Sequence, residues 1–193
     1  MRFVAALLLS YGPALAQTVS PFTVTEISRR FDERGKLISE HRFRFAVNRN
    51  GAIVSADLDP EAAGVRQIRD AARGRDVLID PKLRTATLSY TASRAVSPSS
   101  CVERFLTISG AAVSVEKSAG TIHAVPVERV TIEQSQRGLD LYLAPSLGCH
   151  ALRSIVRRDG QILETQATQD LEIGDPDPAL FEIPHGYRIN TIP

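Results

Sequence analysis

The sequence predicts a mainly β protein built on an antiparallel sheet, and two observations support this fold class. Apolar and polar residues alternate with a period of two in several segments, which is typical of strands with one buried face. Short turns that contain glycine separate these segments at spacings that suit hairpins. Sequential hairpins build an antiparallel meander, whereas a parallel sheet needs long crossover connections.

The alternation is strongest in the segments HRFRFAV, RTATLSYTA and LDLYLA. In each of them, apolar side chains take every second position, and mostly charged or hydroxyl side chains take the positions between. The apolar positions are Phe43, Phe45, Val47, Ala86, Leu88, Tyr90, Ala92, Leu139, Leu141 and Leu143. A weaker pattern predicts further strands in residues 22–31, 127–134 and 161–169.

Three short segments have the composition of hairpin turns. ERGK (33–36), NRNG (48–51) and RDGQ (158–161) each place a glycine where a chain reversal needs positive φ. Asn50-Gly51 and Asp159-Gly160 are dipeptides that two-residue hairpins prefer.

Residues 58–74 (LDPEAAGVRQIRDAARG) have two interpretations. Asp59 and Pro60 suit the start of a helix, but Gly64 weakens a helix by about 1 kcal/mol. In the second interpretation a helical turn near 60–63 is followed by the strand VRQIRD, the turn AARG and the strand RDVLID. We favour the second, although the pattern leaves open whether 60–73 is helix or strand.

The first sixteen residues have the three-part pattern of a secretory signal peptide. Arg2 precedes an apolar stretch from Phe3 to Leu9, and Ala14-Leu15-Ala16 forms a small-x-small cleavage site. A bilayer-spanning helix needs roughly 20 apolar residues, so this stretch is too short. We expect a signal peptide over residues 1–16, cleavage after Ala16, and export to the periplasm or the medium, with no transmembrane anchor in the mature chain.

The remaining residues, 17–193, are enough for a single β-rich domain. Removal of the leader removes Arg2 alone among the charged residues. Lys and Arg then fall from 23 to 22, which equals the 22 Asp and Glu. A chain without a basic surplus is not expected to bind nucleic acid nonspecifically.

Cys101 and Cys149 are the only two cysteines of the sequence. In an oxidising compartment an isolated pair most simply forms a disulfide, which here would tie the polar loop 93–101 to the end of a strand. A redox pair would favour C-x-x-C spacing. A zinc site of both cysteines with His150 and His123 is the other alternative, but these residues lack paired ligand spacing. We predict the disulfide and no metal site.

No catalytic motif is evident. His41, His123, His150 and His185 stand outside any motif, and we expect each to be exposed or half-buried. ISGAAVS (108–114) is not a nucleophile elbow, and DLDPE (57–61) lacks the glycine and the terminal glutamate of a calcium loop. The sequence therefore predicts no catalytic residue and no cofactor. A secreted hydrolase would need a histidine and a carboxylate or hydroxyl converging from distant segments.

Several stretches, taken in order, resemble exported bacterial proteins of the outer-membrane lipoprotein carrier (LolA/LolB-like) superfamily, in its uncharacterised branches. The stretches are SRRFDERGKLISEHRFRFAVNRNG, VLIDPKLRTATLSY, AGTIHAVPVERVTI, LDLYLAPSLGCHALRSIVRRDGQ and LEIGDPDPALFEIPHGY. The resemblance covers roughly residues 22–187. It implies a curved antiparallel sheet, a half-barrel, with one or two short helices and a concave apolar face. In the carriers this face holds acyl chains.

The resemblance and the strand pattern together suggest a lipid or acyl-chain ligand for a non-enzymatic exported protein. We expect the ligand groove to be lined by the alternating apolar positions Phe43, Phe45, Val47, Ala86, Leu88, Tyr90, Leu141 and Leu143. The alternative is that these residues form a filled core, and that the protein contacts an envelope protein or has a structural role.

The segment GDPDPALFEIPHGY (174–187) predicts a docked chain end. Its prolines cannot donate ladder hydrogen bonds, so a strand must end before them. Asp177 is placed to cap one helical turn. Phe181 and Ile183 then share one side of the chain, and we expect them to enter the open end of the half-barrel.

Overall fold

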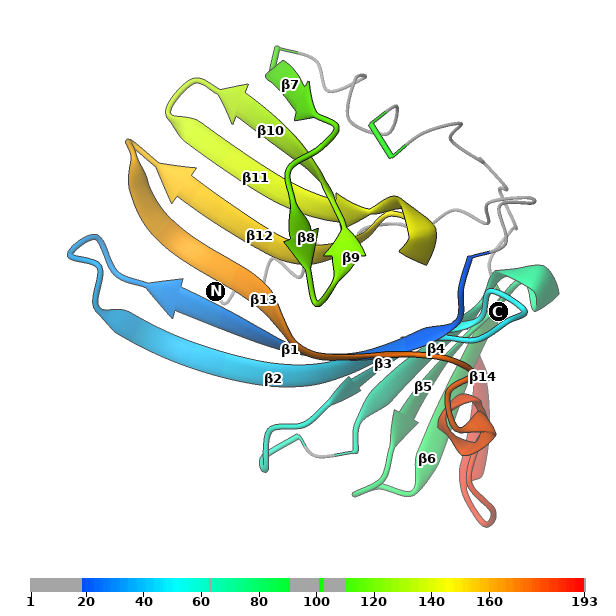
Figure 1. Cartoon of the computed structure of the whole chain (residues 1–193). Helices are drawn as coiled ribbons and strands as arrows, with labels where there is room; N and C mark the ends of the chain where they lie inside the picture. Colours follow the sequence, from blue (N-terminus) through cyan, green and yellow to red (C-terminus); the bar gives the residue numbers. More distant parts are fainter. Residues whose placement is uncertain (1–18, 63, 91–100, 103–109, 193) are drawn as a thin grey trace.

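The computed structural model describes residues 19–62, 64–90, 101–102 and 110–192. Within them, twelve strands form one curved sheet and two short strands form a separate hairpin (Figure 1). The first half of the large sheet comprises β1 (Phe22–Phe31), β2 (Leu37–Val47), β3 (Ile53–Asp57), β4 (Arg66–Asp70), β5 (Arg75–Asp80) and β6 (Thr85–Tyr90). The second half comprises β7 (Ala112–Glu116), β10 (Glu128–Gln134), β11 (Arg137–Ala144), β12 (His150–Arg158), β13 (Gln161–Ile173) and β14 (Arg188–Ile192).

The strands follow the order β14-β6-β5-β4-β3-β2-β1-β13-β12-β11-β10-β7. Every neighbouring pair is antiparallel except β14 and β6, which run parallel. The mainly β, mostly antiparallel fold class predicted from the alternation is confirmed. The three strongest patterns lie in β2, β6 and β11, and the three weaker ones in β1, β10 and β13.

The hairpin turns lie where the glycines predicted them. Gly35, Gly51 and Gly160 have φ of 77°, 75° and 78°. At the last of these turns Asp159 also has positive φ, 51°, as the Asp-Gly preference for tight hairpins requires.

Residues 58–74 form a turn and a hairpin, so the favoured interpretation is confirmed. The strands β4 and β5 are joined by the short 3₁₀ turn η1 (Ala71–Arg73), which ends at Gly74 in the left-handed region. No helix follows Asp59 in the described residues, and its carboxylate accepts a hydrogen bond of 3.1 Å from the backbone N–H of Arg42 on β2. The described residues contain no α-helix; the predicted short helices are 3₁₀ turns, which include η2 (Pro145–Leu147) and η3 (Pro178–Phe181).

Two of the register shifts in the sheet lie where it separates into two arms. The pairing of β1 with β13 shifts between Thr25 and Glu26, and that of β11 with β12 shifts between Tyr142 and Leu143. Pairing between β12 and β13 begins only at Arg153 with Ala167. The first residues of β12 therefore pair only with β11, while the last residues of β13 pair only with β1. A bulge bends its strand and increases the twist, so an inner space opens between the two arms.

Apolar residues fill this inner space and form what we call the inner cluster. Its buried members come from both arms and from the segment before β10: Phe22, Val24, Val47, Val125, Val127, Ala144, Leu147 and Leu152. Phe45, Ile53 and Leu171 are among the half-buried residues that pack against it. The cluster thus joins the two arms by apolar contact where backbone pairing has ended.

A second cluster covers the opposite face of β2–β6. Ala46 and Val54 belong to this outer cluster, while their chain neighbours Val47 and Ile53 belong to the inner cluster or pack against it. Successive side chains of a strand point to opposite faces, so the sheet is buried on both sides here. The remaining buried members of the outer cluster are Ile68, Val77, Ile79 and Ala86.

The C-terminal segment supplies the cover of the outer cluster. Leu180, Phe181, Ile183 and Tyr187 pack against it. The side chain of Asp177 caps η3 by accepting from the backbone N–H of Ala179 at 2.9 Å, as the sequence predicted. Docking of Phe181 and Ile183 is thus confirmed, but their expected place was wrong: they lie against a face of the sheet and not in an open end of a barrel.

The predicted signal peptide, residues 1–16, lies outside the described residues. Among the residues that are described, no helix has the length and hydropathy needed to cross a membrane.

We expect Phe181→Ala to lower the free energy of unfolding by about 2 kcal/mol, because it removes a phenyl ring that the C-terminal segment packs on the outer cluster. Chemical denaturation of the mature protein would measure the loss. His185→Ala, an exposed position of the same segment, is the control and should change little. Equal stability of Phe181→Ala and the wild type would contradict the docking.

Candidate functional site

A small hairpin outside the main sheet covers the inner cluster. It consists of β8 (Thr121–Ile122) and β9 (Val125–Pro126), and we refer to residues 119–127 as the covering hairpin. Figure 1 shows it crossing between the arm of β10–β12 and the arm of β1 and β2. Val125 and Val127 are buried members of the inner cluster, and Ala119 and Ile122 pack against it.

The tip of the covering hairpin has an unfavourable backbone conformation. His123 and Ala124 have φ of 49° and 62°. Tight hairpins normally place Asn or Gly at two such positions, because a Cβ disfavours positive φ. The side chain of His123 is held in place by a hydrogen bond of 3.0 Å between its Nε2 and the backbone carbonyl of Thr168, next to the bulge in β13. The tip is therefore fixed by its contact with the sheet and not by its own turn preference.

A buried polar group lies within the inner space. The Glu26 side chain is 1% exposed, and its Oε1 lies 3.0 Å from Nε2 of His150. Its Oε2 accepts a hydrogen bond of 3.0 Å from Nε2 of Gln166. The ring of His150 stacks on Phe45, with centroids 4.6 Å apart, and lies 5.1 Å from Phe22. A histidine and a carboxylate from distant segments thus meet in apolar surroundings.

Sequence reasoning missed this group. His150 is buried, so the expectation that it is exposed or half-buried was wrong. Glu26 follows Phe22 and Val24 on the same face of β1, and all three are buried. The sequence signal for a buried carboxylate was the position of Glu26, two residues after Val24 on the apolar face of this strand. The alternation in this strand is weak, so the buried face could not be assigned from the sequence.

The predicted groove residues do not share one surface in the structure. Val47 belongs to the inner cluster and Phe45 packs against it. Phe43, two residues before Phe45 on β2, is half-buried. Ala86 belongs to the outer cluster and Leu88 packs against it, while Tyr90 is 64% exposed. Leu141 and Leu143 belong to a third cluster around Cys101.

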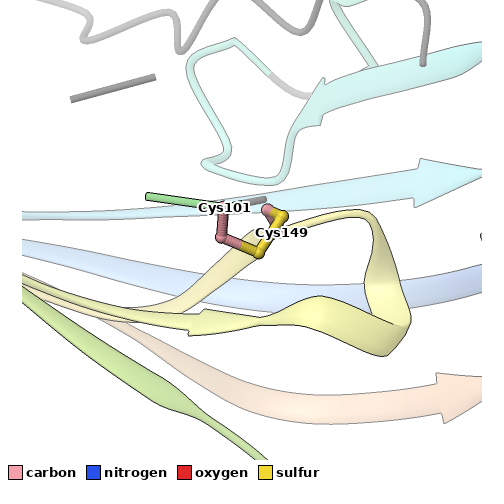
Figure 2. The surroundings of a disulfide bond; sticks show 2 residues. All are labelled: Cys101 and Cys149. Carbon is pink, nitrogen blue, oxygen red and sulfur yellow. A yellow bond between two sulfur atoms is a disulfide. The ribbon is translucent and has the colours of Figure 1, made fainter. Parts of the chain in front are cut away.

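Cys101 and Cys149 form a disulfide (Figure 2). Cys149 lies between η2 and β12, and Cys101 is buried with Val130, Ile132, Leu141, Leu143 and Ala151. The bond spans a sequence separation of 48 residues, which corresponds to about 4 kcal/mol of stabilisation in the chain-entropy model. Such a bond indicates an oxidising, extracytoplasmic compartment.

A second buried carboxylate, Asp140 on β11, is held by neighbouring strands. Its side chain is 1% exposed, and it accepts hydrogen bonds from Arg129 Nη2 at 3.0 Å, from Thr131 Oγ1 at 2.8 Å and from Arg157. Burial raises the pKa of Asp140, but the hydrogen bonds from Arg157, Thr131 and Arg129 outweigh it and hold the pKa below the ordinary value. The same contacts raise the pKa of both arginines, so the group is an ionised structural cluster.

Two pockets, of about 450 and 640 Å³, are lined by described residues, and both are polar. The first lies beside Arg44, Asp170, Glu172, Asp175 and Asp177, and the second beside Arg137, Arg158 and Glu33. Neither is lined by a predicted groove residue. In the part of the chain that the structure describes, no three His, Cys, Asp or Glu side chains are grouped so that they could hold a metal ion.

Comparison of this fold with solved structures gives similarity to MucB, with 20% identity, a TM-score of 0.52, and coverage of 91% of this chain and 61% of that chain. The overall fold is LolA-like. PNGF-II is similar over 90% of this chain and 32% of its own, with 9% identity and a TM-score of 0.50. The chain therefore spans less than two thirds of each of these proteins.

A LolA superfamily protein from Nitrosomonas europaea, NE2245, is also matched, over 85% of this chain and 90% of its own, with 10% identity and a TM-score of 0.38. No protein-family profile and no curated protein matches the sequence.

We expect Asp140→Asn to lower the free energy of unfolding by about 2 kcal/mol at pH 7, because it leaves Arg129 and Arg157 without their buried anion. The pKa of Asp140 is depressed by folding, so its stabilisation is complete above pH 3.8 and is lost as the pH falls through the lower value of the folded state. The difference between variant and wild type should shrink in that acidic range. Denaturation curves from pH 7 to pH 2 would measure it, with Asp159→Asn as the exposed control.

Proposed function

We propose that this chain is an exported, non-enzymatic protein that binds a lipid or acyl chain in the inner space of its curved sheet, in the periplasm or outside the cell. The observation that carries the proposal is the covering hairpin. An apolar wall lies between two arms of the sheet, and the segment that covers it is not part of that sheet.

The chemistry of the covering hairpin is that of the proposed ligand. It contacts the inner cluster through Ala119, Ile122, Val125 and Val127, which are aliphatic side chains. A buried methylene group contributes about 0.8 kcal/mol whether it comes from a side chain or from an acyl chain. An acyl chain that replaced these four side chains would therefore recover much of the apolar burial that is lost when the hairpin leaves.

The backbone of the covering hairpin also permits its displacement. The N–H of Ala119 bonds to the carbonyl of Val127 at 3.1 Å, and the N–H of Val127 bonds to the carbonyl of Gly120 at 3.0 Å. These bonds lie within the hairpin, so they move with it. Opening would break the contact between His123 and Thr168 without breaking the ladders of the twelve-stranded sheet.

The wall that a ligand would contact includes two of the residues expected from the sequence, Phe45 and Val47. Phe22, Ile53 and Leu152 complete it from neighbouring strands. The remaining members of the expected groove, Phe43, Ala86, Leu88, Tyr90, Leu141 and Leu143, lie outside the inner cluster and are not part of the wall proposed here.

Native mass spectrometry of the mature protein, purified gently from its own envelope, tests the proposal. We expect a bound mass in the range of a lipid or fatty acid that is released by mild denaturation. A protein that carries no bound mass, and that gains none when mixed with fatty acids, long-chain alcohols or long-chain amines, would contradict the proposal.

Competition between hairpin and ligand gives a second test. Val125→Ala weakens the packing of the covering hairpin, so we expect the affinity for a fluorescent fatty acid to rise by up to about tenfold. Val77→Ala is the matched control, because it makes the same change at a buried position of the outer cluster. An affinity that is unchanged in Val125→Ala, or raised equally in both variants, would show that the hairpin does not compete with the ligand.

A role in envelope protein contacts is the second candidate. The edge strand β14 is exposed along its whole length, and Ile189 and Ile192 are 57% and 53% exposed. An exposed edge strand can pair with an extended segment of another protein. This candidate gains support if native mass spectrometry finds a bound polypeptide and no lipid.

A further inference from the structure

We propose that Glu26 and Thr168, supported by His150 and Gln166, form a polar subsite in the inner space that takes the hydrogen-bond-donating headgroup of an amphiphile, an amine or a hydroxyl. This inference rests on the proposed function and specifies the class of ligand.

The acceptor of the subsite is the carboxylate of Glu26. Each carboxylate oxygen offers about two lone-pair positions. One contact is made by Oε1, to His150, and one by Oε2, to Gln166, both at 3.0 Å. These contacts fix the carboxylate from two sides and leave acceptor capacity on both oxygens.

Thr168 supplies an independent observation. It is directly opposite Glu26 in the pairing of β1 with β13, so the two side chains share a face. Its residue is 9% exposed, and its hydroxyl is buried without a hydrogen-bond partner in the structure. Buried polar groups are hydrogen-bonded in nearly all cases. A hydroxyl that lacks a partner beside a carboxylate with spare capacity points to a group supplied from outside the chain.

The covering hairpin connects this subsite to the ligand space. His123 contacts the backbone carbonyl of Thr168, the same residue whose hydroxyl lacks a partner. Phe22 and Phe45, which belong to the apolar wall, both lie against the ring of His150. A ligand that displaces the hairpin therefore meets the apolar wall along its chain and the subsite at its polar end.

The charge of the subsite selects the headgroup. A buried carboxylate repels a fatty-acid carboxylate or a phosphate, because charges interact more strongly where water is excluded. It attracts an ammonium group and accepts from a hydroxyl. Amines and alcohols with a long alkyl chain should therefore bind more tightly than the carboxylate of equal length.

The experiment compares dodecylamine, dodecanol and dodecanoate as competitors of a bound fluorescent fatty acid, each below its micelle concentration or its solubility limit. Ethanolamine is added as a fourth competitor to test whether a free polar amine suffices. We expect the wild type to bind dodecylamine about tenfold more tightly than dodecanoate, and ethanolamine to compete poorly.

Two variants assign the preference to the subsite. Glu26→Gln removes the charge and keeps the shape, so the ratio between amine and carboxylate should fall below about threefold. Thr168→Val removes only the hydroxyl and should weaken dodecanol and dodecylamine by about threefold to tenfold. Thr25→Val is the control, because Thr25 is on the other face of β1, beside the first polar pocket. Thermal melting confirms that each variant is folded, and Thr168→Val keeps the test decisive if Glu26→Gln unfolds.

The outcomes separate this inference from the proposed function. If all three long-chain competitors bind equally, the subsite is refuted and the lipid-binding function stands. If the wild-type preference persists in folded Glu26→Gln or Thr168→Val, the headgroup lies elsewhere and the subsite is also refuted. If ethanolamine competes as well as dodecylamine, the ligand is a small polar molecule and not an amphiphile. If no competitor and no probe binds, both proposals fail.

Discussion

Apolar contact across the inner cluster is the interaction on which the rest of the structure depends. Backbone pairing between β12 and β13 covers only part of the two strands, since it begins at Arg153 with Ala167. Beyond that pair the arms are joined by apolar side chains, among them Phe22, Val47 and Leu152, and by one backbone hydrogen bond of 3.4 Å from the N–H of Ser20 to the carbonyl of Ser146. The proposed ligand site lies in that region, where β12 and β13 are not paired and apolar burial holds the arms together.

The sheet is covered on each face by another part of the same chain. The covering hairpin lies on the inner cluster, and the C-terminal segment lies on the outer cluster. The two covers differ in how they are attached. The C-terminal segment is anchored by β14 and by a hydrogen bond of 2.5 Å from Arg66 to the carbonyl of Glu182, whereas the hairpin tip is attached through one histidine side chain and has a costly backbone conformation. The inner cover is therefore the one suited to move.

Local features of the fold could be predicted from the sequence, and long-range ones could not. Alternation placed β2, β6 and β11, and the glycines at 35, 51 and 160 placed their turns, because both signals depend on a few neighbouring residues. Alternation says which side chains share a face of one strand, but not which faces of distant strands meet. That is why Leu88 and Val47, both expected in one groove, lie on opposite faces of the sheet. The register shifts where the arms separate have no signal in the local pattern.

The candidate site was the least predictable part for the same reason. Glu26 and His150 are far apart in the sequence and meet only because the arms close on each other. His123 and Ala124 have positive φ but carry no turn signature, because neither is the Asn or Gly that such positions favour. The cysteine pair, by contrast, was predictable, because two cysteines in one chain have only one intramolecular pairing.

The disulfide has a mechanical consequence for this arrangement. Cys101 and Cys149 close a covalent ring that includes β7, the covering hairpin, β10 and β11. The covering hairpin therefore lies inside the covalent ring that the disulfide closes, with β7 before it and β10 after it in the chain. If the hairpin is displaced as proposed, the pairing of β7 with β10 keeps both of its ends beside the inner space. A reducing environment would open this ring, and the hairpin would then be held only by the pairing of β7 with β10 and by its own contacts with the inner cluster.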